Sequence, residues 1–244
     1  MAEQRNSQHR DDRAKTVPME ENRRVSFAPA APAPENDREL APLPVFSENY
    51  RGDRNLPSNM PANVPEHENC AVFITGLPAT INTRELLAHI RETGRVWQSH
   101  INPSNGQHNF AAAKVTFFVR AAAENFVNAT RNGFFVGGDQ AHVSYNRHKV
   151  RSQPMGVYKS RVLIVRGNPT WVNLPDLLAI VQTTLRFWDL DEHFTRQIAE
   201  DEVEITMQFG SFRAQAESAH IVLNRRLGRL GVTFTFGPDP CGLI

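Results

Sequence analysis

Two stretches decide the fold, ITGLPATINTRELLAHIRET at residues 74–93 and VRGNPTWVNLPDLLAIVQTT at residues 165–184. They start 91 residues apart, and seven of their twenty positions are identical without a gap. Each begins as an apolar strand, leaves it through Gly-x-Pro, and reaches an Asn that is followed three positions later by an acid. This is the pattern of a capped helix start, and Leu-Leu with a β-branched residue then falls on one helix face. The chain therefore contains two copies of one strand–helix unit.

Both copies continue with two strands, a helix and a closing strand. In the first copy these elements are expected at residues 95–101, 112–118, 120–130 and 140–145, with a Gly-Gly hairpin turn at 137–138. In the second copy they are expected at residues 194–198, 203–209, 213–227 and 232–236. The strand at 194–198 is the least secure, because residues 187–192 fit a helix extension or a loop equally well. The order β-α-β-β-α-β, twice, predicts the α+β class with two ferredoxin-like domains, each a four-stranded antiparallel sheet with two helices.

Composition divides the chain into four parts. Residues 1–68 are rich in Pro, Asn, Glu and Arg and have almost no periodic apolar pattern, so we expect a disordered tail. The first domain is expected at 69–149, a linker at 150–160 and the second domain at 161–240. Residues 70–149 hold eight basic and four acidic residues, whereas residues 162–244 hold seven and ten. A polyanionic partner therefore suits the first domain better than the second.

Several classes of function find no support. No apolar run approaches the ~18 residues that span a bilayer, and the first residues lack the apolar core of a signal peptide. With only two cysteines, we expect a nuclear or cytoplasmic protein without a Cys-based zinc site. The nine His residues lack metal-ligand spacing. No phosphate-binding loop or catalytic constellation is present, so we expect neither an enzyme, nor a cofactor, nor a metal.

The hexamer VFITGL at residues 72–77 and the octamer FAAAKVTF at 110–117 carry a resemblance to the RNA-recognition-motif (RRM) family. This resemblance implies single-stranded RNA bound on an open sheet face, with bases stacked on aromatic side chains of the two central strands. Strand alternation places Phe73 and Thr75 on that face. In the octamer, however, the two stacking positions hold Ala112 and Lys114. Because each base–aromatic stack contributes roughly 1–3 kcal/mol, the resemblance implies weak RNA binding of modest specificity.

Other side chains are candidates for supporting contacts. His142 and Ser144 alternate with core positions on the closing strand, so both should face outward. His100 and Trp97 are candidates on the strand at 95–101, where a bulge would exchange their faces. The segment after the closing strand carries three further candidates for phosphate contacts, whose alternative is a solvated linker: Arg147, Lys149 and Arg151.

The second copy departs further from the family. The positions that correspond to the stacking sites hold Ile164, Glu204 and Thr206. An acidic domain with no ring at these positions is a poor platform for an anion. We therefore interpret it as a pseudo-RRM that supports the first copy or binds protein.

Both ends of the chain carry short motifs. Arg24-Val25-Ser26-Phe27 resembles the docking motif for protein phosphatase 1, in which Val25 and Phe27 would fill pockets at a sheet edge. Arg-Arg-x-Ser also resembles a kinase site, and phosphate on Ser26 would weaken docking. This motif gives the alternative function, a protein-binding scaffold that recruits the phosphatase. Cys241 begins a loose match to a prenylation signal, but no polybasic run precedes it, and we favour an unmodified cysteine.

Overall fold

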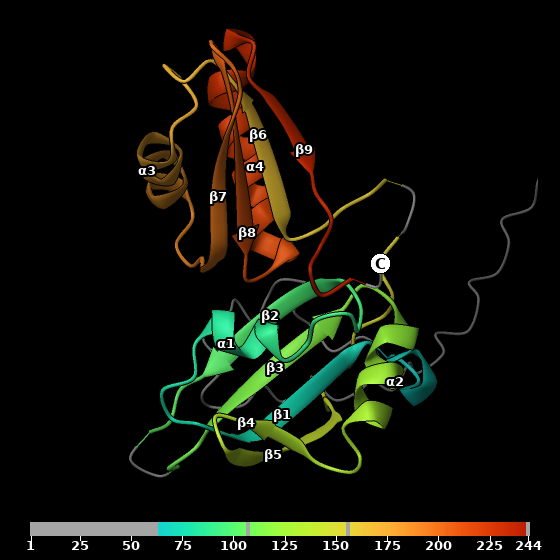
Figure 1. Ribbon diagram of the computed structural model, residues 1–244. Helices are drawn as coiled ribbons and strands as arrows, with labels where there is room; N and C mark the ends of the chain where they lie inside the picture. Colours follow the sequence, from blue (N-terminus) through green and yellow to red (C-terminus); the bar gives the residue numbers. More distant parts are fainter. Residues whose placement is uncertain (1–62, 106–107, 155–156, 243–244) are drawn as a thin grey trace, which may run out of the picture. The chain divides into compact units, whose positions relative to one another are not determined.

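The computed structural model describes residues 63–105, 108–154 and 157–242, in which the two copies form two antiparallel sheets (Figure 1). The first sheet has the strand order β2-β3-β1-β5-β4 and the second the order β7-β8-β6-β9. The elements of the first copy are β1 (Ala71–Leu77), α1 (Thr83–Ala88), β2 (Val96–Asn102), β3 (Ala111–Phe117), α2 (Arg120–Ala129), β4 (Phe134–Val136) and β5 (Asp139–Tyr145). Those of the second are β6 (Val162–Gly167), α3 (Leu174–Thr184), β7 (Leu190–Ala199), β8 (Glu202–Phe209), η3 (Phe212–Ala216), α4 (Glu217–Leu227) and β9 (Thr233–Phe236). The α+β class and the repeated β-α-β-β-α-β order are confirmed.

The predicted helix caps explain where the first helix of each copy begins. The side chain of Asn82 accepts a hydrogen bond from the Glu85 N–H at 2.9 Å, and the Glu85 carboxylate accepts one from the Asn82 N–H. Asn173 caps α3 in the same way by accepting from the Asp176 N–H at 3.0 Å. These bonds satisfy backbone donors that a helix start leaves without partners.

Four elements differ from the sequence-based expectation. The first sheet has a fifth strand, β4, which pairs with β5 across the turn Gly137-Gly138; both glycines have positive φ, as a two-residue hairpin turn requires. The helix α1 ends at Ala88, several residues before Gly94, which is the helix terminator expected from the sequence. The strand β7 begins at Leu190, so that part of the segment left open between helix and loop is strand. The last helix begins at Glu217, after a kinked segment, rather than at residue 213.

Each copy has its own apolar core, and each core includes one buried side chain from the other copy. Phe118, at the end of β3, packs in the second core, where its ring lies 5.5 Å from that of Phe212. Cys241, which follows β9, is fully buried in the first core. The expected linker also pairs with the first copy, since Cys70 N–H donates to the Val150 carbonyl at 2.7 Å. Both copies lie within one compact unit of the chain.

A buried ionic network joins the copies near Cys241. The Arg161 guanidinium donates to Asp191 at 2.8 Å and to Asp239 at 2.9 Å, and all three side chains are buried. The other oxygen of Asp239 accepts from the Val96 N–H of β2 at 2.9 Å. Burial alone would lower the pKa of Arg161. The negative charges of Asp239 and Asp191 raise it by more than burial lowers it, so the pKa lies above its ordinary value and the guanidinium stays charged. Because an unpaired buried charge is strongly destabilising, this network makes the copies interdependent.

Candidate nucleic-acid interface

The open face of the first sheet carries one row of four side chains in register across four strands. Lys114 of β3 lies opposite Phe73 of β1 on one side and His100 of β2 on the other, and Ser144 of β5 lies opposite Phe73. Phe73 and Lys114 are half-buried, whereas His100 is exposed. Val72 and Ile74, the neighbours of Phe73, are fully buried in the core. The faces of β1 and β3 therefore follow the predicted alternation.

A second row lies beside the first. Thr75 of β1 is exposed and pairs with His142 of β5, which is exposed as well. Ala112 of β3 is half-buried and pairs with Asn102 of β2. These two rows thus offer a single aromatic ring, Phe73, with a cation and two imidazoles around it. On the edge strand β4, Phe135 is 61% exposed and pairs with Gln140, which faces the same side as His142 and Ser144.

Positive charge gathers at Lys114 without a counter-ion. Burial lowers the pKa of Lys114, and the nearby positive charge of Arg213 lowers it further. Arg213 comes from the second copy, and its guanidinium stacks on the Trp97 ring at 4.9 Å from the ring centre. Neither Lys114 nor Arg213 forms an ion pair with any carboxylate in the part of the chain that the structure describes. Two like charges held together in this way favour an anion between them.

Three basic residues after β5 lie in different electrostatic settings. Arg147 is exposed and forms no ion pair among residues 63–105, 108–154 and 157–242. Lys149 pairs with Glu66 at 2.7 Å, and Arg151 with Glu68 at 2.8 Å. Ion pairs of such exposure contribute only about 0–1 kcal/mol, so a phosphate could displace either carboxylate.

His148 ties this segment to the sheet face. Burial is the main cause that lowers its pKa, and the charges of Lys114 and Arg147 add to the effect. Lys114 and Arg147 therefore both lie close enough to His148 for their charges to act on it.

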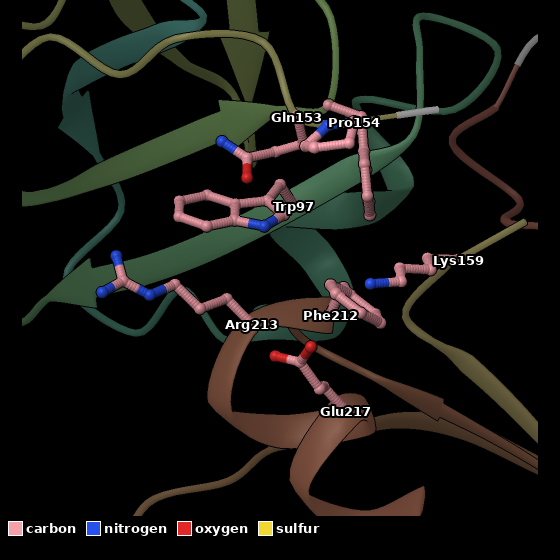
Figure 2. A pocket seen from close by; sticks show the side chains of 8 residues that line it. Trp97, Gln153, Pro154, Lys159, Phe212, Arg213 and Glu217 are labelled. Atoms are coloured by element: carbon pink, nitrogen blue, oxygen red, sulfur yellow. The ribbon is translucent and has the colours of Figure 1, made fainter. Parts of the chain in front are cut away.

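A pocket of about 180 Å³ lies beside the edge strand β2 (Figure 2). Its aromatic walls come from Trp97 of β2, Phe118 after β3 and Phe212 of η3, and its polar lining includes Lys159, Arg213 and Glu217. Trp97 lies at the register shift of β2 between Val96 and Gln98, which is the bulge considered from the sequence. That bulge turns Trp97 towards the second copy, while His100 stays on the open face.

Arg213 was missed from the sequence because its position depends on tertiary structure. A helix from residue 213 would have carried it as one exposed base among several. Instead, Arg213 and Ala214 have non-helical backbone angles, and Ala214 has a positive φ of 61°. No local sequence signal indicates this kink.

The open face of the second sheet has the same register but different chemistry. Its corresponding row is Phe194, Thr206, Ile164 and Thr235. In the next row Glu204 lies between Arg166 and Arg196 and accepts hydrogen bonds from both, from Arg196 at 3.0 Å. Phe194 is 53% exposed and is the one aromatic ring in this row. The two arginines of this face are therefore already engaged by a buried carboxylate.

The motifs near the two ends have different outcomes. Arg24, Val25, Ser26 and Phe27 lie outside the described residues, so phosphatase docking stays a prediction. Cys241 is 0% exposed, and burial is the main cause that raises the pKa of its thiol to about 12. A thiol so placed is inert in the folded protein.

The described residues contain neither a membrane-spanning helix nor a candidate metal cluster. Within the described residues, no helix is both long and apolar enough to cross a membrane. The same residues contain no group of three or more His, Cys, Asp or Glu side chains that could hold a metal ion.

No family model matches the chain, and no curated protein matches it in sequence. Among solved structures, the third RRM of Pes4 is 22% identical, covers 34% of this chain and 96% of its own, and superposes with a TM-score of 0.29. RNA recognition domains 1 and 2 of Sex-lethal from Drosophila melanogaster are 18% identical and cover 69% of this chain and all of theirs, with a TM-score of 0.29. The first two RRMs of the yeast poly(U)-binding protein Pub1 are 10% identical and cover 69% and 99%, with a TM-score of 0.30. By its own strand order and register, the chain contains two copies of the ferredoxin-like β-α-β-β-α-β fold.

Proposed function

We propose that this chain is an RNA-binding protein that holds single-stranded RNA on the open face of its first sheet. The observation that carries the proposal is the pair Lys114 and Arg213, two neighbouring cations without a carboxylate partner in the described chain, beside Phe73. An RNA strand supplies a phosphate as the anion that the two cations lack, and a base that can stack on the Phe73 ring.

Some residues of the open face would contact the RNA bases, and others would contact the RNA backbone. Phe73 stacks one base, and Lys114 with Arg213 binds the adjoining phosphate. Thr75 and His142, which lie opposite each other, supply hydrogen bonds to the next nucleotide. A single stack of roughly 1–3 kcal/mol implies modest affinity that depends strongly on salt.

The basic segment after β5 would extend the backbone contacts. Arg147 is exposed and available directly. Lys149 and Arg151 would exchange their ion pairs with Glu66 and Glu68 for phosphates. These two residues therefore contribute less than Arg147, because each must first lose a partner.

Fluorescence anisotropy of a labelled single-stranded RNA, titrated at several salt concentrations, tests the proposal. We expect Phe73→Ala to weaken binding by roughly 1–3 kcal/mol at every salt concentration. A matched control is Phe187→Ala, which removes an exposed ring that follows α3 in the second copy. Lys149→Ala combined with Arg151→Ala should weaken binding less and reduce the salt dependence.

Two results would contradict the proposal. If the parent protein shows no RNA affinity at low salt, the function is wrong. If Phe73→Ala binds as tightly as the parent, stacking on the first sheet is wrong and only electrostatic attraction remains.

The tail motif supports a second candidate function, recruitment of protein phosphatase 1 through Arg24, Val25 and Phe27. A pull-down of the phosphatase with the tail peptide tests it, beside a peptide carrying Val25→Ala and Phe27→Ala. Loss of recovery in the variant is expected, as is loss on phosphorylating Ser26. Equal recovery would remove this candidate.

A further inference from the structure

We infer that the pocket beside β2 binds one nucleotide of the RNA strand, with its base between Trp97 and Phe212 and its phosphate on Arg213 and Lys159. The inference rests on the proposed RNA binding and extends it. It makes the second copy a part of the RNA site, although the arginines of that copy's own sheet face are already paired with Glu204.

The pocket adjoins the open face through Arg213. One guanidinium both stacks on the Trp97 ring at 4.9 Å and influences the charge of Lys114. Lys114 is the neighbour of Phe73 in the first row. A strand whose base stacks on Phe73 therefore reaches the pocket by passing its backbone over Lys114 and Arg213.

The chemistry of the lining suits one nucleotide. Trp97, Phe118 and Phe212 supply three aromatic walls, and every base offers a π-face to such walls. Arg213 and Lys159 form no ion pair with any carboxylate in the described part of the chain. The Lys159 ammonium lies 5.8 Å from the centre of the Phe212 ring. Cations beside rings are thus already in place for a phosphate next to a stacked base.

Glu217 limits what else could occupy the pocket. Its carboxylate lines the same space and accepts hydrogen bonds only. It would repel a second phosphate, so a run of backbone does not fit. It would instead accept from the N–H groups on the Watson–Crick edge of a base. One phosphate with one base satisfies both the cations and the carboxylate.

The backbone around Arg213 is held in an uncommon conformation. Ala214 has a positive φ of 61°, which is strained for a residue with a side chain. Ser211, two residues before Arg213, accepts from the Ser99 N–H at 2.8 Å and donates to the Ser99 carbonyl at 3.1 Å. Its own N–H donates to the Gln215 side chain. These bonds fix the kink that directs Arg213 to Trp97, and preorganised cations of this kind favour binding because little ordering remains to be done.

Binding of the full chain to a uridine octamer, with one abasic nucleotide placed at each position in turn, tests the inference. In the parent we expect two sensitive positions, each weakening binding roughly fivefold or more. Phe73→Ala should abolish the sensitivity at one position and Trp97→Leu that at the other. Arg213→Gln, which removes no core side chain, should lower the salt slope by about one. Arg226→Gln, on the exposed face of α4, is the matched control and should change neither.

The outcomes separate the inference from the function on which it rests. No binding by the parent overturns both. If Phe73→Ala removes one sensitive position but Trp97→Leu and Arg213→Gln leave the abasic profile and the salt slope of the parent, the RNA lies on the sheet alone and the pocket inference is wrong. Melting temperatures show whether Trp97→Leu has unfolded. If it has, the salt slope of Arg213→Gln alone decides whether the pocket binds RNA.

Discussion

The two sheet faces of this molecule share a strand order and a register, yet they differ in how their charges are satisfied. On the first face Lys114 has a second cation, Arg213, as its neighbour and no carboxylate partner in the described chain. On the second face Glu204 engages both Arg166 and Arg196. The central position of the row holds Phe73 in the first copy and Ile164 in the second.

The difference teaches that a shared fold does not distribute function evenly. The first face leaves Lys114 and Arg213 without a carboxylate partner in the described chain, whereas the second pairs its arginines internally with Glu204. The second copy still contributes Arg213, Phe212 and the buried network around Arg161 to its neighbour. We propose that its role is to complete and support the first copy rather than to duplicate it.

The largest expected effect comes from breaking the network that joins the copies. Arg161→Met leaves two buried carboxylates, Asp191 and Asp239, without their cation, and should lower the free energy of unfolding by about 3–5 kcal/mol. Urea denaturation measures this, with Arg226→Met as the exposed control. Burial raises the pKa of Asp191 and Arg161 lowers it, so without Arg161 this carboxyl takes up a proton at a higher pH and the loss should shrink as the pH falls. A loss below 1 kcal/mol would mean that the copies do not depend on this network.

The next largest effect, on RNA affinity, is expected when the central residues of the two faces are exchanged. Phe73→Ile should weaken RNA binding by about 1–3 kcal/mol, because the ring is lost while an apolar side chain of similar position remains. The reverse change, Ile164→Phe, should leave the affinity unchanged, because Glu204 still engages the neighbouring arginines. Anisotropy titrations measure both. A clear gain from Ile164→Phe would show that the second face lacks only a ring at its central position.

A smaller effect removes the carboxylate from the second face. Glu204→Gln frees Arg166 and Arg196, so the protein should gain weak RNA affinity at low salt and a salt slope steeper by up to about two. Glu202→Gln, which changes a nearby acid on the same strand that forms no described ion pair, is the control. An unchanged salt slope would show that the ion pairs of Glu204 with Arg166 and Arg196 are not what prevents RNA binding on the second face.

The smallest effect is a dependence on pH. Burial and Arg213 lower the pKa of Lys114, so its charge is lost at a lower pH than that of an ordinary lysine. RNA affinity should therefore decline as the pH rises towards 10, and the decline should begin below the usual lysine range. Lys114→Arg stays charged throughout and should flatten the profile. Identical profiles for the two proteins would place Lys114 away from the RNA.

Much of the fold follows from local sequence patterns. The caps at Asn82 and Asn173 and the faces of β1 and β3 depend on short spacings, and all four agree with the structure. Two features could not be predicted, the kink that places Arg213 and the exchange of Phe118 and Cys241 between the cores. Both depend on contacts between residues far apart in the chain. The face was therefore predictable, whereas the contribution of the second copy was not.

Amide chemical-shift mapping of the full chain with a uridine octamer tests the central claim most directly. We predict shifts on β1 and β3 around Phe73 and Lys114 and around Arg213, and none on β6 and β8 around Ile164 and Thr206. Shifts centred on the second sheet face, or no shifts on the first sheet face at saturating RNA, would contradict the claim that RNA binds on the first sheet.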